Sequence, residues 1–267
     1  MKIAILQPSD FHQLADIQPA EWYDPIPIHQ FYYQAPYCFS FKVELNGNPV
    51  GVGTIIYHDD VAWLAHILVH KDHQRKGIGK KITAYLLDHA LNNGLKTVYL
   101  IATDMGAPVY SKLGFKEETE YVIYKDIEYN NKQTPSQHII PYSKAHQHAV
   151  FALDSLITGE NRIDNLCLNL NTGYVYIDQD EVTGFYLPNL GDGVIMAKDA
   201  KAGQAFMAMR LQNANTTAIF PKDNFEAMQF MDTLNVKPSG YMKRMIYGEK
   251  RSVKFTQIYN RIGGNLG

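Results

Sequence analysis

The apolar positions in the N-terminal part of the chain recur first at the spacing of a strand, then of a helix, then of strands again. Residues 2–6, KIAIL, form a short apolar run, which predicts a strand. After Pro8, apolar side chains recur at helical spacing, at Phe11, Leu14 and Ile17. Residues 28–34 predict a second short helix. Residues 38–58 predict an antiparallel hairpin around Asn46-Gly47, because this pair tolerates the positive φ of a tight turn.

A strand, a loop and a longer helix follow. Residues 63–69 are apolar and predict the strand, and the helix after them repeats apolar residues at Ile78, Ile82, Tyr85 and Leu86. Asn92-Asn93-Gly94 ends this helix with residues that tolerate the left-handed conformation. A buried-type strand at 97–103, a short helix at 106–115 and a strand at 117–126 complete the predicted order.

The loop between that strand and that helix combines two glycines with four cations in residues 73–82, HQRKGIGKKI. Glycine lets the backbone come close to a ligand, and the helix N-terminus supplies unpaired N–H groups and positive partial charge. This combination predicts a phosphate site. A Walker A loop is excluded because Lys81 stands where Ser or Thr is needed, and a dinucleotide fingerprint is excluded because Ile82 replaces its third small residue.

Residues 74–79, Gln-Arg-Lys-Gly-Ile-Gly, resemble the (Gln/Arg)-x-x-Gly-x-(Gly/Ala) pyrophosphate loop of the GNAT family of acyl-CoA-dependent N-acyltransferases. For the loop alone, a basic surface turn is the alternative. Residues 110–115 resemble the Tyr-x-x-x-Gly-Phe element of the same family, which lies beside the thioester. The resemblance implies a GNAT acetyltransferase domain at 1–128. Its fold class is α/β (α+β), with a mixed, mostly antiparallel sheet flanked by helices.

The resemblance also implies how acetyl-CoA, the cosubstrate, is held. Backbone N–H groups of the loop would surround the pyrophosphate, and backbone groups at the end of the preceding strand would pair with the pantetheine arm where the sheet splays apart. The residues expected to bind the cosubstrate are Leu68, Val69, Gln74, Arg75, Lys76, Gly77, Ile78, Gly79, Lys80 and Tyr110.

Tyr110 is also the candidate catalytic acid. A phenol has a pKa of about 10 and a thiol of about 8.5, so a phenol beside the sulfur can donate its proton to the leaving thiolate and regain it from solvent. The alternative is that Tyr110 only packs over the cosubstrate.

The base that deprotonates the amine is harder to find. A free alkylamine has a pKa of about 10.4, so at neutral pH it must lose a proton to a side chain or to water. Some relatives carry glutamate on the strand before the loop, but here that position falls on Trp63. His66 is the catalytic candidate in its place, with Glu44 and Asp104 as further candidates by neighbourhood. A hydrogen-bonded strand histidine is an equally good interpretation of His66.

No metal site and no disulfide are expected. His66, His70 and His73 are spaced four and three apart, which places side chains on one face of a helix but not of a strand and turn. Cys38 and Cys167 are the only cysteines, and they form no CxxC pair.

The C-terminal half repeats features of the first half. Residues 5–13, ILQPSDFHQ, and 139–147, IIPYSKAHQ, match in register, as expected for an internal repeat. The Tyr-x-x-Leu-Gly-Phe segment at 110–115 has a counterpart in Met-x-x-Leu-Asn-Val at 231–236. A duplication follows from these two matches, with an unrelated α/β domain as the alternative.

The duplication predicts a degenerate, GNAT-like α/β domain at 138–250, joined by a polar linker at 125–138 and followed by a C-terminal tail at 251–267. Its loop position falls near 196–206, which keeps neither the glycine pair nor the Gln/Arg start. The second half is therefore expected to bind no acyl-CoA.

Composition limits the partners. The formal net charge is -2, so the chain lacks the global positive field of nucleic-acid binders, and 46% apolar residues suffice for real cores. The early break of the first apolar run at Gln7-Pro8 argues against a signal peptide, and no run is long enough to span a membrane. We expect a cytoplasmic protein with no nucleic-acid or membrane partner.

The function expected is transfer of an acetyl group from acetyl-CoA to a primary amine of a small molecule or a peptide, by direct attack on the thioester. The absent glutamate leaves a second possibility, a catalytically silent acyl-CoA sensor. A plain anion-binding protein is the third, and it would show no preference for CoA over ADP.

Overall fold

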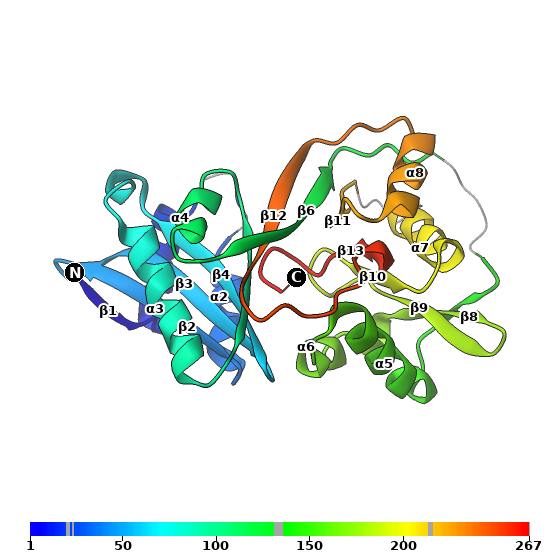
Figure 1. Ribbon diagram of the computed structural model, residues 1–267, viewed down its shortest axis with the longest axis horizontal. Helices are drawn as coiled ribbons and strands as arrows, with labels where there is room; N and C mark the ends of the chain where they lie inside the picture. The colour runs from blue at the N-terminus through cyan, green and yellow to red at the C-terminus, as the bar shows by residue number, and fades with distance from the viewer. Residues whose placement is uncertain (20–21, 23, 131–135, 213–215, 267) are drawn as a thin grey trace. The chain divides into compact units, whose positions relative to one another are not determined.

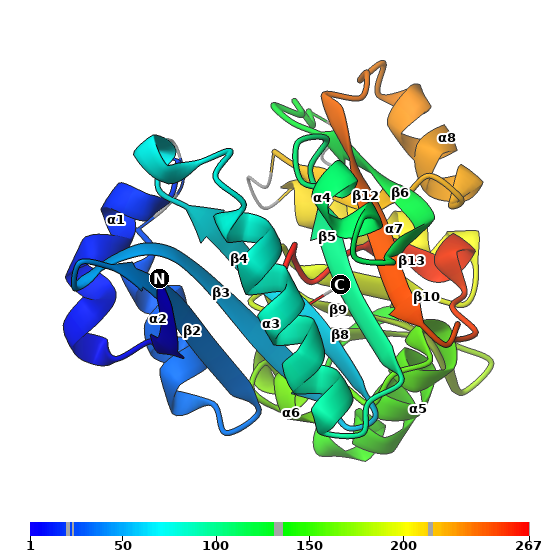
Figure 2. The ribbon, with the colours of Figure 1, turned by 60° about the vertical axis from the view of Figure 1, so that its left-hand side comes forward.

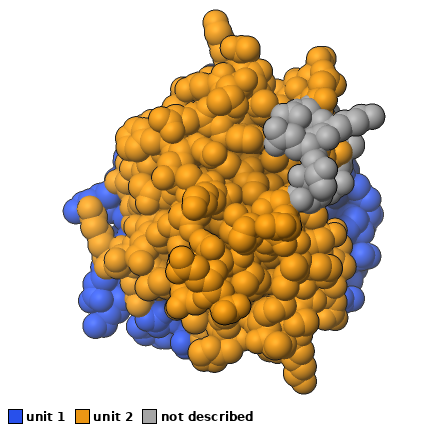
Figure 3. Space-filling model, turned by 90° about the vertical axis from the view of Figure 1, so that its right-hand side faces the viewer, with its two compact units in different colours: residues 1–116, 245–249, 264–266 blue, residues 117–244, 250–263, 267 orange. Residues whose placement is uncertain are grey.

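A computed structural model describes residues 1–19, 22, 24–130, 136–212 and 216–266. The chain forms two compact units, coloured separately in Figure 3. Among the described residues, unit 1 comprises 1–116, 245–249 and 264–266, and unit 2 comprises 117–244 and 250–263.

Unit 1 is built on a mixed, mostly antiparallel sheet (Figure 1). Its strands lie in the order β1–β2–β3–β4–β5, followed by the last residues of β12. The elements are β1 (Lys2–Ile5), η1 (Pro8–Gln13), α1 (Leu14–Ile17), α2 (Ile26–Gln34), β2 (Cys38–Leu45), β3 (Asn48–His58), β4 (Val61–Val69), η2 (Lys71–His73), α3 (Ile78–Asn92), β5 (Thr97–Ala102), α4 (Ala107–Ser111) and β12 (Gly240–Gly248).

Helix α3 packs closely on the sheet because β3 carries glycines beneath it. A Cβ atom at Gly51 would lie 2.9 Å from Cδ1 of Ile82, and one at Gly53 would lie 2.5 Å from Cγ2 of the same side chain. Larger residues would push the helix away from the strand. The close contact fixes the start of α3, at Ile78, relative to the end of β4.

The two central strands of unit 1 run parallel and then separate. β4 pairs with β5 from Val61–Thr97 to Leu64–Leu100. β4 continues to Val69 without further β5 partners among the described residues, and Figure 2 shows the two strands diverging toward their C-terminal ends. The edge of β4 after Leu64 is therefore open on the side where β5 would otherwise lie.

Unit 2 repeats the start of this arrangement. Its five-stranded sheet has the order β13–β10–β9–β8–β7, and β12, β6 and β11 form further strands. The elements are β6 (Lys116–Tyr124), β7 (Ile139–Pro141), η3 (Lys144–His146), α5 (Gln147–Thr158), α6 (Ile163–Cys167), η4 (Leu170–Thr172), β8 (Tyr174–Asp178), β9 (Glu181–Leu187), β10 (Val194–Ala197), α7 (Ala200–Gln212), β11 (Ala218–Pro221), α8 (Phe225–Thr233), η5 (Phe255–Gln257) and β13 (Ile258–Asn260).

The predicted order of elements and the fold class are confirmed. The first helix differs in detail, because the segment after Pro8 is a 3-10 helix that continues into the short α1. In the expected linker at 125–138, the described residues 125–130 and 136–138 contain no helix or strand, and 131–135 lie outside the described residues.

The compact units divide the chain differently from the predicted domains at 1–128 and 138–250. Residues 245–249 belong to unit 1, because Met245 enters its core and the Glu249 N–H donates to the Lys96 carbonyl at 2.9 Å. A strand from the end of the chain thus completes the N-terminal sheet, and strand exchange of this kind has no local sequence signature. The predicted bounds stay a prediction of where the duplicated segments begin and end.

Candidate active site

The loop between β4 and α3 presents a run of free backbone donors. Arg75 has φ +57° and Gly77 has φ +80°, so left-handed residues alternate with others along the turn. Among the described residues, the N–H groups from Arg75 to Lys80 have no hydrogen-bond acceptor, and the first helical bond is Lys81 N–H to the Gly77 carbonyl, at 3.0 Å. Successive free N–H groups at a helix N-terminus form an anion-binding concavity.

The glycines of this loop leave space beside those donors. A Cβ atom at Gly77 would meet no atom within 4 Å, and one at Gly79 would meet only Cγ2 of Val69, at 3.7 Å. Packing therefore does not require glycine at position 79. A group bound close to the backbone would explain why this position is glycine. Gly77, in contrast, is needed for its positive φ.

Side-chain hydrogen bonds hold the loop in place, and its cations remain free to attract an anion. Gln74 donates from Nε2 to the Val69 carbonyl at 3.2 Å, and Lys76 donates to the Asp72 carbonyl at 2.8 Å. The side chain of Ile78 is buried in the core. No ion pair to an acidic side chain is formed by Lys76 or by the other exposed loop cations, Arg75 and Lys80, in the described part of the chain.

Leu68 and Val69 lie on the open part of β4. They pair with Val52 and Gly51 of β3 on one side, and their β5 side is free of strand partners among the described residues. The structure thus brings the strand edge and the loop together, one directly after the other. A pantetheine arm could add to this edge as a strand while its pyrophosphate reaches the loop.

Tyr110 lies in α4, the helix that follows β5. Its ring packs against Phe115, with centroids 6.2 Å apart, and covers Gly106, where a Cβ atom would come within 2.9 Å of the ring. No described residue hydrogen-bonds its hydroxyl. Burial raises the pKa of Tyr110 to about 12, so the phenol carries its proton at neutral pH.

His66 lies at a bulge of β4 and not in regular strand. Its φ is +47°, where the β3–β4 register shifts. Nδ1 lies 2.9 Å from Oη of Tyr32, and that oxygen accepts a bond from Nδ2 of Asn265 at 2.7 Å. Burial, with a smaller effect of neighbouring His29, lowers the pKa of His66 to about 4. No local pattern predicts the part played by Tyr32 or Asn265, because both hydrogen bonds join residues far apart in the sequence.

The other positions considered in the search for a base lie apart from one another. Trp63 is fully buried and its ring lies 5.1 Å from that of Tyr99. Glu44 forms an ion pair with Lys42 at 2.8 Å, and Asp104 is exposed after the end of β5.

Of the three histidines considered for a metal, His70 and His73 have ring contact at 5.6 Å. His66 belongs to a separate aromatic group with Tyr32 and His29.

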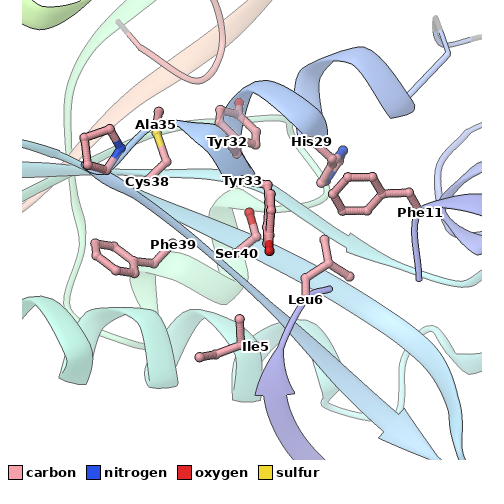
Figure 4. A pocket seen from close by; sticks show the side chains of 11 residues that line it. Ile5, Leu6, Phe11, His29, Tyr32, Tyr33, Ala35, Cys38, Phe39 and Ser40 are labelled. Atoms are coloured by element: carbon pink, nitrogen blue, oxygen red, sulfur yellow. The ribbon is translucent and has the colours of Figure 1, made fainter. Parts of the chain in front are cut away.

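A small cavity lies between α2 and strands β1 and β2 (Figure 4). Its volume is about 220 Å³, and its described lining is mostly apolar. The lining includes Tyr32 and His29 but none of the residues expected to bind the cosubstrate. The cavity is thus distinct from the loop and the open strand edge.

Unit 2 closes the corresponding positions. Only Lys198 and Asp199 separate β10 from α7, and the Asp199 carboxylate accepts the Ala202 N–H at 3.0 Å. An anion at this helix N-terminus would meet a negative charge.

A strand also covers the edge of β10 that corresponds to the open edge of β4. β13 pairs with β10 at Ile195–Asn260 and Met196–Ile258. The carboxylate of Asp199 at the start of α7 and the strand β13 on the edge of β10 both support the prediction that the second half binds no acyl-CoA.

The part of the chain that the structure describes contains no helix long and apolar enough to cross a membrane. A comparison with curated protein sequences found no match. The model of the acetyltransferase (GNAT) family matches residues 9–115.

Solved structures share the whole fold. An acetyltransferase candidate from Pyrococcus horikoshii superposes with a TM-score of 0.82 at 21% identity, over 100% of this chain and 95% of that one. A GCN5-related N-acetyltransferase from Anabaena variabilis has a TM-score of 0.62 at 11% identity, over 92% and 72%. A tandem GNAT protein from the clavulanic acid biosynthesis pathway has a TM-score of 0.60 at 12% identity, over 94% and 99%.

Residues 9–115 lie in unit 1 and include the loop, the open strand edge and Tyr110. Residues 9–115 therefore match the acetyltransferase (GNAT) family, and the chain as a whole has the fold of solved GNAT acetyltransferases, a tandem GNAT protein among them.

Proposed function

We propose that the protein transfers an acetyl group from acetyl-CoA to a primary amine of a small molecule or peptide. The observation that carries this proposal is the run of unbonded N–H groups from Arg75 to Lys80, directly after the open edge of β4. A diphosphate needs such donors, and an extended amide-bearing arm needs such an edge. CoA has both parts in one molecule.

The transfer has a simple balance of atoms. The amine nitrogen forms a bond to the thioester carbon, the carbon–sulfur bond breaks, and the electron pair leaves on sulfur. The sulfur takes the Tyr110 proton. The amine loses one proton to water, because no carboxylate has been identified at this position among the described residues. Tyr110 suits this role because its hydroxyl has no protein partner among the described residues and is protonated at neutral pH.

A specific observation also supports the sensor alternative. Fully buried Trp63 occupies the strand position where some relatives have glutamate, and Glu44 is already paired with Lys42. A protein that binds acetyl-CoA but cannot deprotonate an amine would report cosubstrate concentration without consuming it.

A mass-spectrometric screen tests both hypotheses, the transferase and the sensor. Purified protein is incubated with acetyl-CoA and a panel of amines and peptides, and acetylated products and free CoA are measured. Products with any amine support the transferase, whereas tight CoA binding without turnover across the panel supports the sensor. Equal affinity for CoA and ADP would contradict both, since it would leave only an anion site.

A further inference from the structure

Three residues from distant parts of unit 1 form one hydrogen-bond chain. Asn265 comes from the C-terminal tail, Tyr32 from α2 and His66 from β4. The distances are 2.7 Å from Asn265 Nδ2 to Tyr32 Oη and 2.9 Å from Tyr32 Oη to His66 Nδ1. Tyr32 is only 1% exposed, so water does not replace these bonds easily.

The direction of each bond follows from the donors available. The amide nitrogen of Asn265 can only donate, so the Tyr32 oxygen accepts that bond. The single hydroxyl hydrogen of Tyr32 is then free for Nδ1 of His66, and Nδ1 must accept it. Because the low pKa keeps the ring neutral at pH 7, its one hydrogen lies on Nε2. Nε2 therefore carries a donor and no lone pair for a proton.

The position of His66 along β4 places this donor toward the thioester end of the expected arm. The pyrophosphate loop follows Val69, and the arm would run back along the open edge toward the start of β4. His66 is three residues before Val69, about 10 Å at the rise of a strand. Its bulged backbone, with φ +47°, is the kind of feature that re-aims a side chain beside a site.

We propose that His66 is a catalytic residue that donates a hydrogen bond from Nε2 to the thioester carbonyl oxygen, and that Tyr32 and Asn265 are positioning residues that fix its tautomer. This inference rests on the proposed function and reverses the expectation that His66 is a base. The carbonyl oxygen gains negative charge as the amine attacks, and a donor held at that oxygen lowers the barrier. His66 Nε2 has no hydrogen-bond partner among the described residues, so it is available to the substrate.

The tautomer is tested without any activity. In protein labelled with ¹⁵N-histidine, the proposal expects the His66 ring at pH 7 to show the Nε2–H pattern of ¹⁵N shifts. Asn265→Asp replaces the donor with an acceptor of the same shape, so the Tyr32 hydrogen turns to Asp and the ring becomes Nδ1–H. An Nδ1–H pattern in the unaltered protein, or no change in Asn265→Asp, would overturn the proposal.

Two substitutions of His66 separate a donor from a base. Glutamine can donate from its amide but cannot accept a proton, whereas alanine can do neither. We expect His66→Ala to lower kcat by about 10²- to 10³-fold with little change in KM for acetyl-CoA. His66→Gln should retain at least about tenfold more activity than His66→Ala. Equal losses in the two variants, or an effect confined to KM for the amine, would contradict the proposal.

A matched pair on α2 tests the positioning role. Tyr32→Phe removes the hydrogen bond to Nδ1 of His66, so we expect the His66 ring to populate both tautomers. We also expect kcat to fall, but by less than in His66→Ala. Tyr33→Phe alters the next side chain along α2, which is 57% exposed and takes no part in the hydrogen-bond chain. It should change neither the His66 tautomer nor kcat. Identical tautomer signals in the unaltered protein and Tyr32→Phe would count against Tyr32.

A non-reactive ketone analogue of acetyl-CoA keeps this test apart from the proposed function. If the analogue binds and shifts the His66 Nε2 proton, the contact exists even if no amine is acetylated. If the analogue binds with no change at His66, the proposal fails while cosubstrate binding stands.

Discussion

Gly79→Trp is expected to abolish stabilisation of the protein by CoA while leaving the fold intact. The Cβ direction at Gly79 is open apart from Val69 Cγ2 at 3.7 Å, so the helix can carry a larger side chain. An indole there would occupy the space that the pyrophosphate needs next to the free amides. Gly79→Ala is the matched control, because one methyl group fits at ordinary contact distance and the family loop accepts alanine there.

The magnitude follows from linkage. Free CoA at one hundred times its Kd stabilises the folded state by about 2.7 kcal/mol, which for a chain of this size is a Tm shift of about 5–10 °C. Gly79→Ala should keep this shift and gain up to about 1 kcal/mol without ligand, because alanine has the higher helix propensity. Gly79→Trp should lose the shift entirely.

Differential scanning fluorimetry with CoA and with ADP measures these shifts, and circular dichroism checks the fold. A full CoA shift in Gly79→Trp would refute the assignment of the loop. So would equal shifts with CoA and ADP in the unaltered protein.

Three further outcomes are expected. Tyr110→Phe should slow turnover by about 10²-fold or more at unchanged CoA affinity, and equal rates in a steady-state assay would remove the acid role. Arg162→Ala leaves the buried Asp154 carboxylate, now 2.5 Å from the guanidinium, without its partner, so urea melts should show a loss of about 3–5 kcal/mol, and a loss near zero would contradict this. The pKa of His66 is lower in the folded than in the unfolded chain, so the stability that comes from neutral His66 is complete above pH 6.5 and is lost as the pH falls toward 4. In urea melts, the difference in free energy of unfolding between the unaltered protein and His66→Gln should therefore narrow between pH 6.5 and 4. A difference that stays constant over this range would contradict the prediction.

Local pattern was enough to predict the loop and its neighbours. Glycine positions, cations and the change from apolar run to helical spacing are all properties of adjacent residues. For that reason Gly77 and Gly79 could be placed at the start of α3 and Leu68 and Val69 at the end of β4. The repeat was readable for the same reason, because matching segments keep their order along the chain.

Long-range pairing was beyond the sequence. Residues 245–249 joining the N-terminal sheet and β13 closing β10 are chosen by tertiary packing, since a three-residue strand has no recognisable period. The hydrogen-bond chain to His66 spans 233 residues between Asn265 and Tyr32. Its consequence, that a histidine predicted as a base presents a donor, depends on which neighbour donates to which. That information lies only in the three-dimensional arrangement of the residues.

Titration of ¹⁵N-labelled protein with CoA, monitored through the backbone amide signals, shows directly where the coenzyme binds. We expect one CoA per chain, with the largest shifts at the amides from Arg75 to Lys80 and smaller ones along the open edge of β4. Shifts centred on Asp199 at the start of α7, or none at the loop under saturating CoA, would contradict it.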